Sequence, residues 1–431
     1  MLPPALLNFA NRLSGYSTNV VRLECQGAKT VGPNNQVRFT LPANALLNMK
    51  SFAVHGAAEA TATNTRVARL PPDLVSMFDR VEVSIGGVQL SAGCSHQNVL
   101  LAAQRALMGS DKGGNMGFTH GEMCRNVSYR TGEVVGLVET HPFAVQGFGG
   151  LLDSEVVLDS SLVGDIVITL HTAPASIISV SNDSNSISNF TSHNASGVGT
   201  YTLNNLFGTI EVMAISDPTY ETLAKQLIAQ KGYIEINFKN VHSSVQTHNG
   251  ASRFNVSTQS LDRIWCTFRD ATAIGPNLPP KQKTGYGFES QHPRIGGSDM
   301  FLPAAFRFRR LQGNNVTMQF SLNGALYPQF PARVEDWMFL SNQSLPQGKI
   351  IERDLTSSSY SLDCHVLCAR LNLPGSEQAR TVSGLDTRGI SLVGQLMSTN
   401  DNAGQPSQCL IFSECTSSLR VGPGRTIEVI M

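Results

Sequence analysis

The sequence predicts an all-β protein made of two β-sandwiches in tandem, with a few short helices. Three observations support this prediction. Short runs rich in Val, Ile, Phe and Thr recur along the chain, and turn-forming residues, including 38 Gly and 20 Pro, separate them. The length of 431 residues suits two or three domains. Several strand patterns of the first half also return, in the same order, in the second half.

The charge balance argues against a function that depends on long-range electrostatic attraction. Lys plus Arg and Asp plus Glu each number 32, and charged residues make up only 15% of the chain. Such a chain has no general attraction for nucleic acid or an anionic membrane, so we expect no specific nucleic-acid binding. No apolar run reaches the roughly 20 residues of a membrane span, and the N-terminus lacks the basic start of a signal peptide.

The first half is predicted to begin with a short leader, residues 1–20, whose apolar spacing favours one helical turn or two. Strand patterns follow the leader. They lie at Val20–Cys25, Val37–Leu41, Ser51–His55, Val81–Ile85, Val127–Tyr129, Val134–Val138, Val156–Leu158, Asp165–Leu170 and Gly208–Met213. A helix is predicted over about Cys94–Met108, because its apolar residues share one face.

Loops and a linker helix complete the predicted organisation. Residues 176–200 are dominated by Ser and Asn, and residues 274–299 are rich in Gly and Pro, so both are predicted to be long surface loops. Between the halves, Asp217 suits a helix N-cap and Gly232 suits a helix end. The predicted units are a leader (1–20), a first sandwich (21–216), a linker helix (217–232) and a second sandwich (233–431).

The internal repeat rests on three pairs of matching segments. They are Phe39–Met49 with Phe254–Ile264, Val83–Gly87 with Phe320–Gly324, and Thr209–Met213 with Thr426–Ile430. A helix candidate follows each member of the second pair, near Arg333–Leu340 in the second half. The third pair predicts that Val429 and Ile430 are buried on a closing strand. Chance similarity among alternating strands is the competing explanation, but the shared order and spacing favour duplication.

These patterns resemble the double jelly-roll major capsid proteins of double-stranded DNA viruses. The resemblance covers nearly the whole chain. The local sequences are most similar to those of the polinton-like virus and virophage groups of the giant-virus-related lineage. It lies in the segments Phe39–Pro42, Val81–Met108, Gly164–Leu170, Ser257–Arg269 and Leu322–Pro328.

The resemblance implies two tandem eight-stranded jelly-roll β-sandwiches and a homotrimer with a nearly hexagonal outline. Such capsomers tile an icosahedral shell, with the two long loops as outward towers. The implied partners are further copies, neighbouring capsomers, minor capsid and penton proteins, and an internal membrane near the leader. The implied location is the virion, after assembly inside the host cell. A minor capsid paralogue is an alternative within the same family.

No residue pattern points to catalysis, and we expect no catalytic, cofactor-binding or metal-binding residues. In Cys364-His365-x-x-Cys368, an extended strand would direct His365 away from both thiols, whereas zinc needs a tetrahedral set. The eight cysteines are predicted to be reduced thiols in a protein made inside a cell. Arg307-Phe-Arg-Arg310 could meet phosphates, but such a run is more often the polar face of a strand.

Two alternatives come from other functional classes. A carbohydrate-binding or adhesin-type double sandwich would need an aromatic platform, for which the long loops offer Phe190, Tyr286 and Phe288. The two tryptophans, Trp265 and Trp337, are expected in the core instead. A glycosidase would need paired carboxylates, which cannot be recognised at strand ends from the sequence alone.

Overall fold

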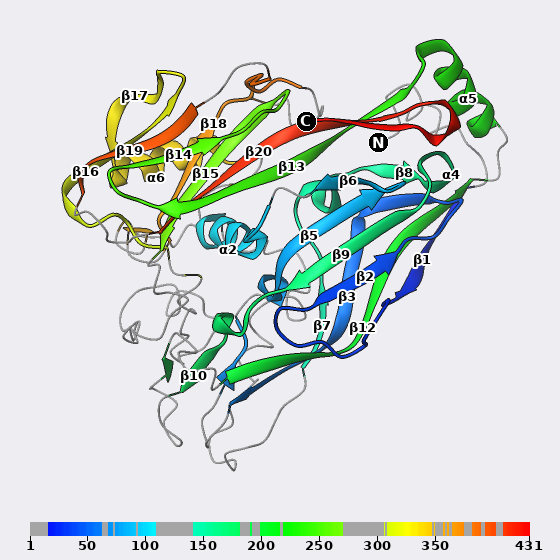
Figure 1. The fold of residues 1–431 in the computed structure, drawn as a ribbon, viewed down its shortest axis with the longest axis horizontal. Helices are drawn as coiled ribbons and strands as arrows, with labels where there is room; N and C mark the ends of the chain where they lie inside the picture. The colour runs from blue at the N-terminus through cyan, green and yellow to red at the C-terminus, as the bar shows by residue number, and fades with distance from the viewer. Residues whose placement is uncertain are drawn as a thin grey trace.

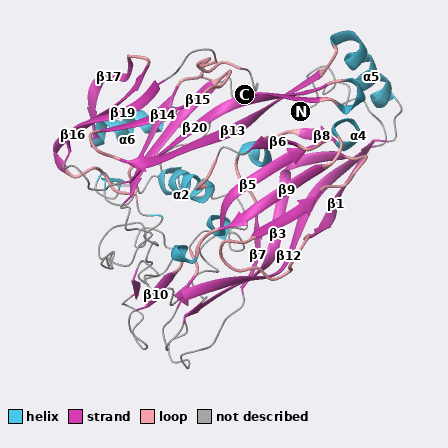
Figure 2. Cartoon of the chain, viewed as in Figure 1, coloured by secondary structure: helices cyan, strands magenta, loops and turns pink. Residues whose placement is uncertain are grey.

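A computed structural model gives the fold as two β-sandwiches, in which strands dominate (Figures 1 and 2). The described residues are 16–62, 68–71, 74–91, 94–108, 141–181, 190–191, 199–215, 219–269, 306, 308–346, 349, 357, 360–361, 364–374, 382–388, 393–401 and 408–431. Among them, no helix is both long and apolar enough to cross a bilayer.

The first sandwich consists of a five-stranded and a four-stranded sheet, and its named strands pair antiparallel. The larger sheet has the order β1 (Tyr16–Glu24), β12 (Gly199–Ile215), β3 (Leu46–Ala62) and β7 (His141–Val145), with β8 (Val157–Asp159) also paired to β3. The smaller sheet has the order β2 (Gln36–Thr40), β9 (Ile166–Thr172), β5 (Phe78–Ile85) and β6 (Val88–Ser91).

The second sandwich repeats this strand order. Its larger sheet is β13 (Ile234–Thr247), β20 (Gln408–Val421), β15 (Leu261–Arg269) and β18 (Val366–Arg370), with β21 (Ile427–Ile430) also paired to β20. Its smaller sheet is β14 (Ala251–Asn255), β19 (Val393–Asp401), β16 (Gly313–Leu322) and β17 (Ala325–Arg333). Each sandwich therefore has eight equivalent strands plus one short additional strand, which confirms the predicted fold class.

Helices occupy equivalent places in the two halves. The helix α2 (Gln97–Met108) follows β6, and α6 (Val334–Ser344) follows β17. Between the sandwiches lies α5 (Thr219–Lys231), and Gly232 after it has a φ of 79°. The short helices are η1 (Leu74–Met77), η3 (Gly150–Asp153), α4 (Ser160–Val163), η4 (Ala175–Ile177) and η7 (Pro423–Arg425).

The first two matching pairs of the repeat are confirmed. The matched apolar residues of the first pair are buried in both sandwiches, from Phe39 to Met49 and from Phe254 to Ile264. In the second pair, two-residue turns join β5 to β6 and β16 to β17. Both residues of each turn have positive φ, which the Gly86-Gly87 and Asn323-Gly324 sequences permit.

The third matching pair is wrong. Strand β12 corresponds to β20, whereas Ile427–Ile430 of the matched segment forms the additional strand β21, which makes a hairpin with the end of β20. Val429 and Ile430 are half-buried rather than buried. The reason is that β21 pairs with Ser418–Val421, beyond the part of β20 that pairs with β15.

Two predicted segment boundaries differ from the structure. Strand β1 begins at Tyr16, so Tyr16–Val20 belong to a sheet rather than to the leader. Part of the predicted loop 176–200 is ordered: β10 (Ser179–Ser181) pairs with β11 (Phe190–Thr191) and with β4 (Ala68–Arg69). The predicted leader helix, the strands near residues 127–129 and 134–138, and the loop 274–299 lie outside the described residues.

Candidate functional site at the junction of the two sandwiches

The two sandwiches meet where the long strands of the second pass over the first. Figure 1 shows β13 and β20 extending over the part of the first sandwich that holds β6 and α4. The turn between β5 and β6 lies against β21, since a Cβ atom at Gly86 would be 2.8 Å from Ile427 Cδ1. Contacts of this kind fix how one sandwich sits on the other.

Polar contacts from β13 fix the junction. The Asn240 side-chain amide donates to the Leu90 carbonyl oxygen at 3.1 Å. The Ser95 backbone N–H donates to Ser243 Oγ at 2.9 Å, and the two Ser hydroxyls are 3.1 Å apart. The Lys239 backbone N–H contacts Ser154 Oγ at 3.3 Å. These contacts hold one edge of the second sandwich against the end of β6, the segment before α2 and the end of η3.

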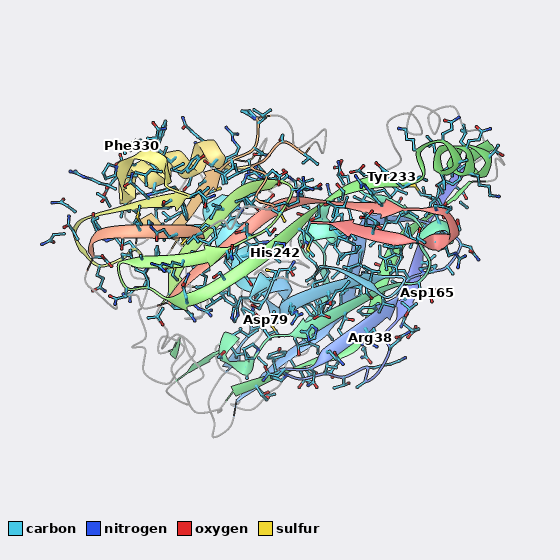
Figure 3. All side chains as sticks on the ribbon, turned by 45° about the horizontal axis from the view of Figure 1, so that its top comes forward. Arg38, Asp79, Asp165, Tyr233, His242 and Phe330 are labelled. Atoms are coloured by element: carbon cyan, nitrogen blue, oxygen red, sulfur yellow. The ribbon has the colours of Figure 1, made fainter. Side chains whose placement is uncertain are left out.

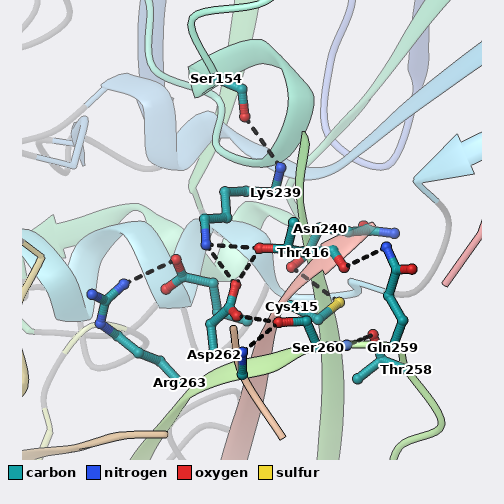
Figure 4. Close-up of polar contacts among 12 residues, drawn as sticks. Ser154, Lys239, Asn240, Thr258, Gln259, Ser260, Asp262, Arg263, Cys415 and Thr416 are labelled. Carbon is teal, nitrogen blue, oxygen red and sulfur yellow. Dashed lines mark hydrogen bonds and ion pairs between the residues drawn. The ribbon is translucent and has the colours of Figure 1, made fainter. Parts of the chain in front are cut away.

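A buried charge lies directly behind these contacts (Figure 4). The Asp262 side chain is fully buried, and its carboxylate accepts hydrogen bonds from Lys239 Nζ at 2.5 Å and Thr416 Oγ1 at 2.5 Å. Ser260 Oγ donates to the other carboxylate oxygen at 2.7 Å. Because a buried carboxylate is costly unless it is paired, these contacts tie β13, β15 and β20 together.

A second ion pair lies beside the first. Arg263 Nη1 is 3.2 Å from Glu414 Oε1, and the Trp265 indole N–H donates to Glu414 Oε2 at 3.1 Å. Burial disfavours the charged Glu414 carboxylate. The positive charges of Arg263 and Lys239 outweigh burial, however, and hold its pKa below the usual value. Here the carboxylates are held by other protein groups, which suits a structural role rather than proton transfer.

Sequence reasoning did not single out the junction residues Lys239, Asn240 and Ser243. A usable signal was present at Asp262-Arg263, because two charged residues interrupt an otherwise apolar strand. Buried charges require partners, so this dipeptide marks a buried network. It does not name the partners, which lie far away in the chain.

The Cys364-His365-x-x-Cys368 segment lies in the core of the second sandwich, where all three side chains are fully buried. The His365 ring packs against Phe268 and Tyr360. Burial, with a contribution from the nearby Arg310 charge, lowers the pKa of His365 to about 3. Within the described part of the chain, no three His, Cys, Asp or Glu side chains gather as metal ligands would.

Of the remaining residues that the sequence singled out, Trp265 belongs to the Glu414 ion pair described above, and the others lie apart from the junction. Phe308 of the basic run is buried and forms an isolated bridge with Cys364, while Arg310 is exposed. Trp265 and Trp337 are buried, as predicted. Of the three loop aromatics, Phe190 lies on β11, and Tyr286 and Phe288 lie outside the described residues.

Comparison with known proteins gives a likeness in fold. No family model and no curated protein matches the sequence. Among solved structures, the PBCV-1 virus capsid matches with a TM-score of 0.59 at 12% identity, covering 96% of each chain. PBCV-1 VP54, fitted into a reconstruction of the virophage Sputnik, matches with a TM-score of 0.58 at 13% identity and the same coverage.

The Faustovirus major capsid protein matches with a TM-score of 0.53 at 10% identity, covering 97% of this chain and 90% of that protein. Identities this low establish the fold and not the activity. The agreement extends over the whole of both sandwiches rather than over one of them. This chain therefore has the fold of the double jelly-roll major capsid proteins of double-stranded DNA viruses.

Proposed function

We propose that this chain is a structural virion protein, the major capsid protein whose homotrimers form the pseudo-hexagonal capsomers of an icosahedral shell. The observation that carries the proposal is the whole-chain match to viral capsid structures, which includes both sandwiches. The proposed role needs no active site, cofactor or metal.

The repeated strand order gives the proposal a physical basis. Three copies of a chain with two similar units present six similar units around a threefold axis, and a nearly hexagonal block can tile a surface. In this proposal the first jelly roll runs from the start of β1 at Tyr16 to residue 216, the second covers residues 233–431, and residues 217–232 connect them. The partners are neighbouring capsomers, minor capsid and penton proteins, and an internal membrane near the N-terminal segment, with assembly inside the host cell.

Light scattering on the purified full-length chain tests this proposal. We expect a mass three times the 46.4 kDa of one chain, and negative-stain images of blocks with a hexagonal outline. A strict monomer at high protein concentration would refute the proposal. Glycan binding by particles without this outline would favour the adhesin alternative. A chain that is scarce in purified virions would instead be the minor paralogue.

A further inference from the structure

Exposed apolar side chains occur at both ends of the molecule. At one end lie Leu326 and Phe330 on β17 and Phe339 on α6, with Phe339 63% exposed. At the other end lies Val20 on β1, which is 64% exposed. Figure 1 places β17 and β1 at opposite ends of the long axis, and Figure 3 shows Phe330 on the outside. The exposed apolar groups of β17 and α6 gather on two elements that contact each other, and such a gathering indicates a surface that another molecule covers.

The repeat identifies which surface of the first sandwich corresponds to β17 and α6. Ile85 and Leu322, each the last strand residue before its turn, are equivalent, and so are the helix starts Gln97 and Val334. In both pairs the residue numbers differ by 237. The same difference places Tyr327 at the position of Leu90, and Ala332 at that of Ser95. In the first sandwich these positions meet β13 of the second sandwich.

The repeat also identifies the counterpart of β13, which is β1. Val20 pairs with Glu211, which pairs with Asn48. Val241 pairs with Glu414, which pairs with Arg263. Asn48 and Arg263 are equivalent, since their residue numbers differ by 215, as do those of the matched residues Leu46 and Leu261. Val20 therefore occupies the position of Val241, between the junction residues Asn240 and Ser243.

The two equivalent positions differ in exposure. Val241 is 8% exposed, whereas Val20 is 64% exposed. The surface formed by β17 and α6 and the surface formed by β1 are thus the two halves of the junction seen within the chain. Because they lie at opposite ends, one chain cannot bring its own two surfaces together.

We infer that β17 and α6 of one copy pack on β1 of a second copy, repeating the junction between the two sandwiches. The inference rests on the proposed function, and it names the surfaces that the copies use. Phe330 lies between Tyr327 and Ala332, so it faces Val20 of the second copy. The contact is head-to-tail, which lets copies close into a ring.

The sequence of β17 favours contact through side chains. In its pairing with β16, Tyr327 lies opposite Phe320 and Ala332 lies opposite Met318, so residues 328–331 form an irregularity of β17 opposite Gln319. Pro328 and Pro331 lack an N–H donor, and proline on an edge strand blocks the addition of a further strand. Phe330 is thereby left as an apolar anchor of the kind that dominates protein interfaces.

Substitution of the anchor tests the inference. Phe330→Asp should weaken self-association of the full-length chain by at least tenfold, measured by sedimentation across a concentration series. Leu373→Asp is the matched control, because Leu373 is 66% exposed on the segment after β18. Far-ultraviolet circular dichroism and tryptophan emission should be unchanged in both variants. If the Phe330→Asp chain is folded and associates like the wild type, the inference is wrong.

A disulfide between copies tests the pairing of the surfaces. The Val20→Cys/Phe330→Cys chain, treated with oxidised glutathione, should form links between chains on a non-reducing gel. In each link, two cysteine thiols are oxidised to one disulfide, and one molecule of oxidised glutathione is reduced to two molecules of glutathione. The wild type and both single variants should form none. A link in the Phe330→Cys chain alone would indicate a twofold contact and overturn the inference.

The remaining outcomes separate the inference from the proposed function. A monomeric wild type would refute the trimeric capsomer itself. A wild-type trimer without the expected link would leave the capsomer in place and overturn this assignment, with the N-terminal segment as the next candidate to cover β1.

Discussion

Replacing Lys239 with Met should destabilise the second sandwich by leaving the Asp262 carboxylate without its ion-pair partner. Asp262 is fully buried, and Lys239 Nζ lies 2.5 Å from its carboxylate. Breaking a buried ion pair by removing one partner costs about 3–5 kcal/mol. Because 25% of the Lys239 side chain is exposed, water can partly replace the amine, so we expect about 3 kcal/mol. That value corresponds to roughly a hundredfold change in the unfolding equilibrium.

Tryptophan emission during guanidinium unfolding is the appropriate assay. The chain has two tryptophans, Trp265 and Trp337, and both lie in the second sandwich. Emission therefore reports on the sandwich that contains the ion pair. The exposed Lys231 on α5 offers a matched control, and Lys231→Met should change the free energy of unfolding by less than about 0.5 kcal/mol.

A double variant separates the loss of the ion pair from the loss of packing. Asp262→Asn removes the buried charge while keeping the shape, so Lys239→Met/Asp262→Asn should be more stable than Lys239→Met alone. The reasoning would be refuted if Lys239→Met unfolded at the same midpoint as Lys231→Met, or if the second substitution made the chain less stable.

Acid should weaken the second sandwich through Glu414, whose pKa is lowered from 4.5. The stabilisation from Glu414 is complete at pH values above its pKa in the unfolded chain, and it is lost as the pH falls through its lower pKa in the folded chain. Glu414→Gln should therefore reduce the loss of unfolding free energy at acid pH, measured by denaturant unfolding across a pH series. Phe39→Ala should cost about 3–5 kcal/mol in the first sandwich, because Phe39 is fully buried; calorimetry should detect a lower melting temperature, and an unchanged transition would contradict the expectation. Gly56→Ala should lower the melting temperature, because its Cβ would lie 3.0 Å from the Asn204 backbone oxygen and 2.8 Å from the Leu206 side chain. Gly32→Ala, with nothing nearer than 3.7 Å, should not, and equal melting temperatures would contradict this.

Local patterns predicted the strands and turns because their requirements are local. The Gly86-Gly87 and Asn323-Gly324 pairs both adopt the positive φ that a two-residue turn demands. The third matching pair failed for a physical reason. Alternation of apolar and polar residues marks any half-buried strand, including the hairpin strand β21. The true counterpart of β12 is β20, which is buried on both faces and therefore shows no such alternation.

The junction could not be predicted because its partners are distant in the chain. Asn240 contacts Leu90 across 150 residues and Ser243 contacts Ser95 across 148 residues, and the ion-pair network behind them joins Asp262 to Thr416 across 154 residues. Which charge meets which depends on strand register, and a shift of one residue would reverse every side chain. Asp262-Arg263 could indicate that a buried network exists, but the fold had to supply its members.

The two versions of the junction differ in chemistry, and the difference has a physical reason. Within the chain, the contacts are hydrogen bonds such as Asn240 to Leu90 and Ser95 to Ser243. The linker keeps the two sandwiches at a high effective concentration, so modest contacts suffice to hold them. Contact between separate chains must also offset the loss of translational and rotational freedom. The equivalent surfaces at the ends of the molecule carry Phe330, Phe339 and Val20 instead. If these surfaces join copies, polar substitution of Phe330 should abolish assembly at low protein concentration while leaving the fold of each chain intact.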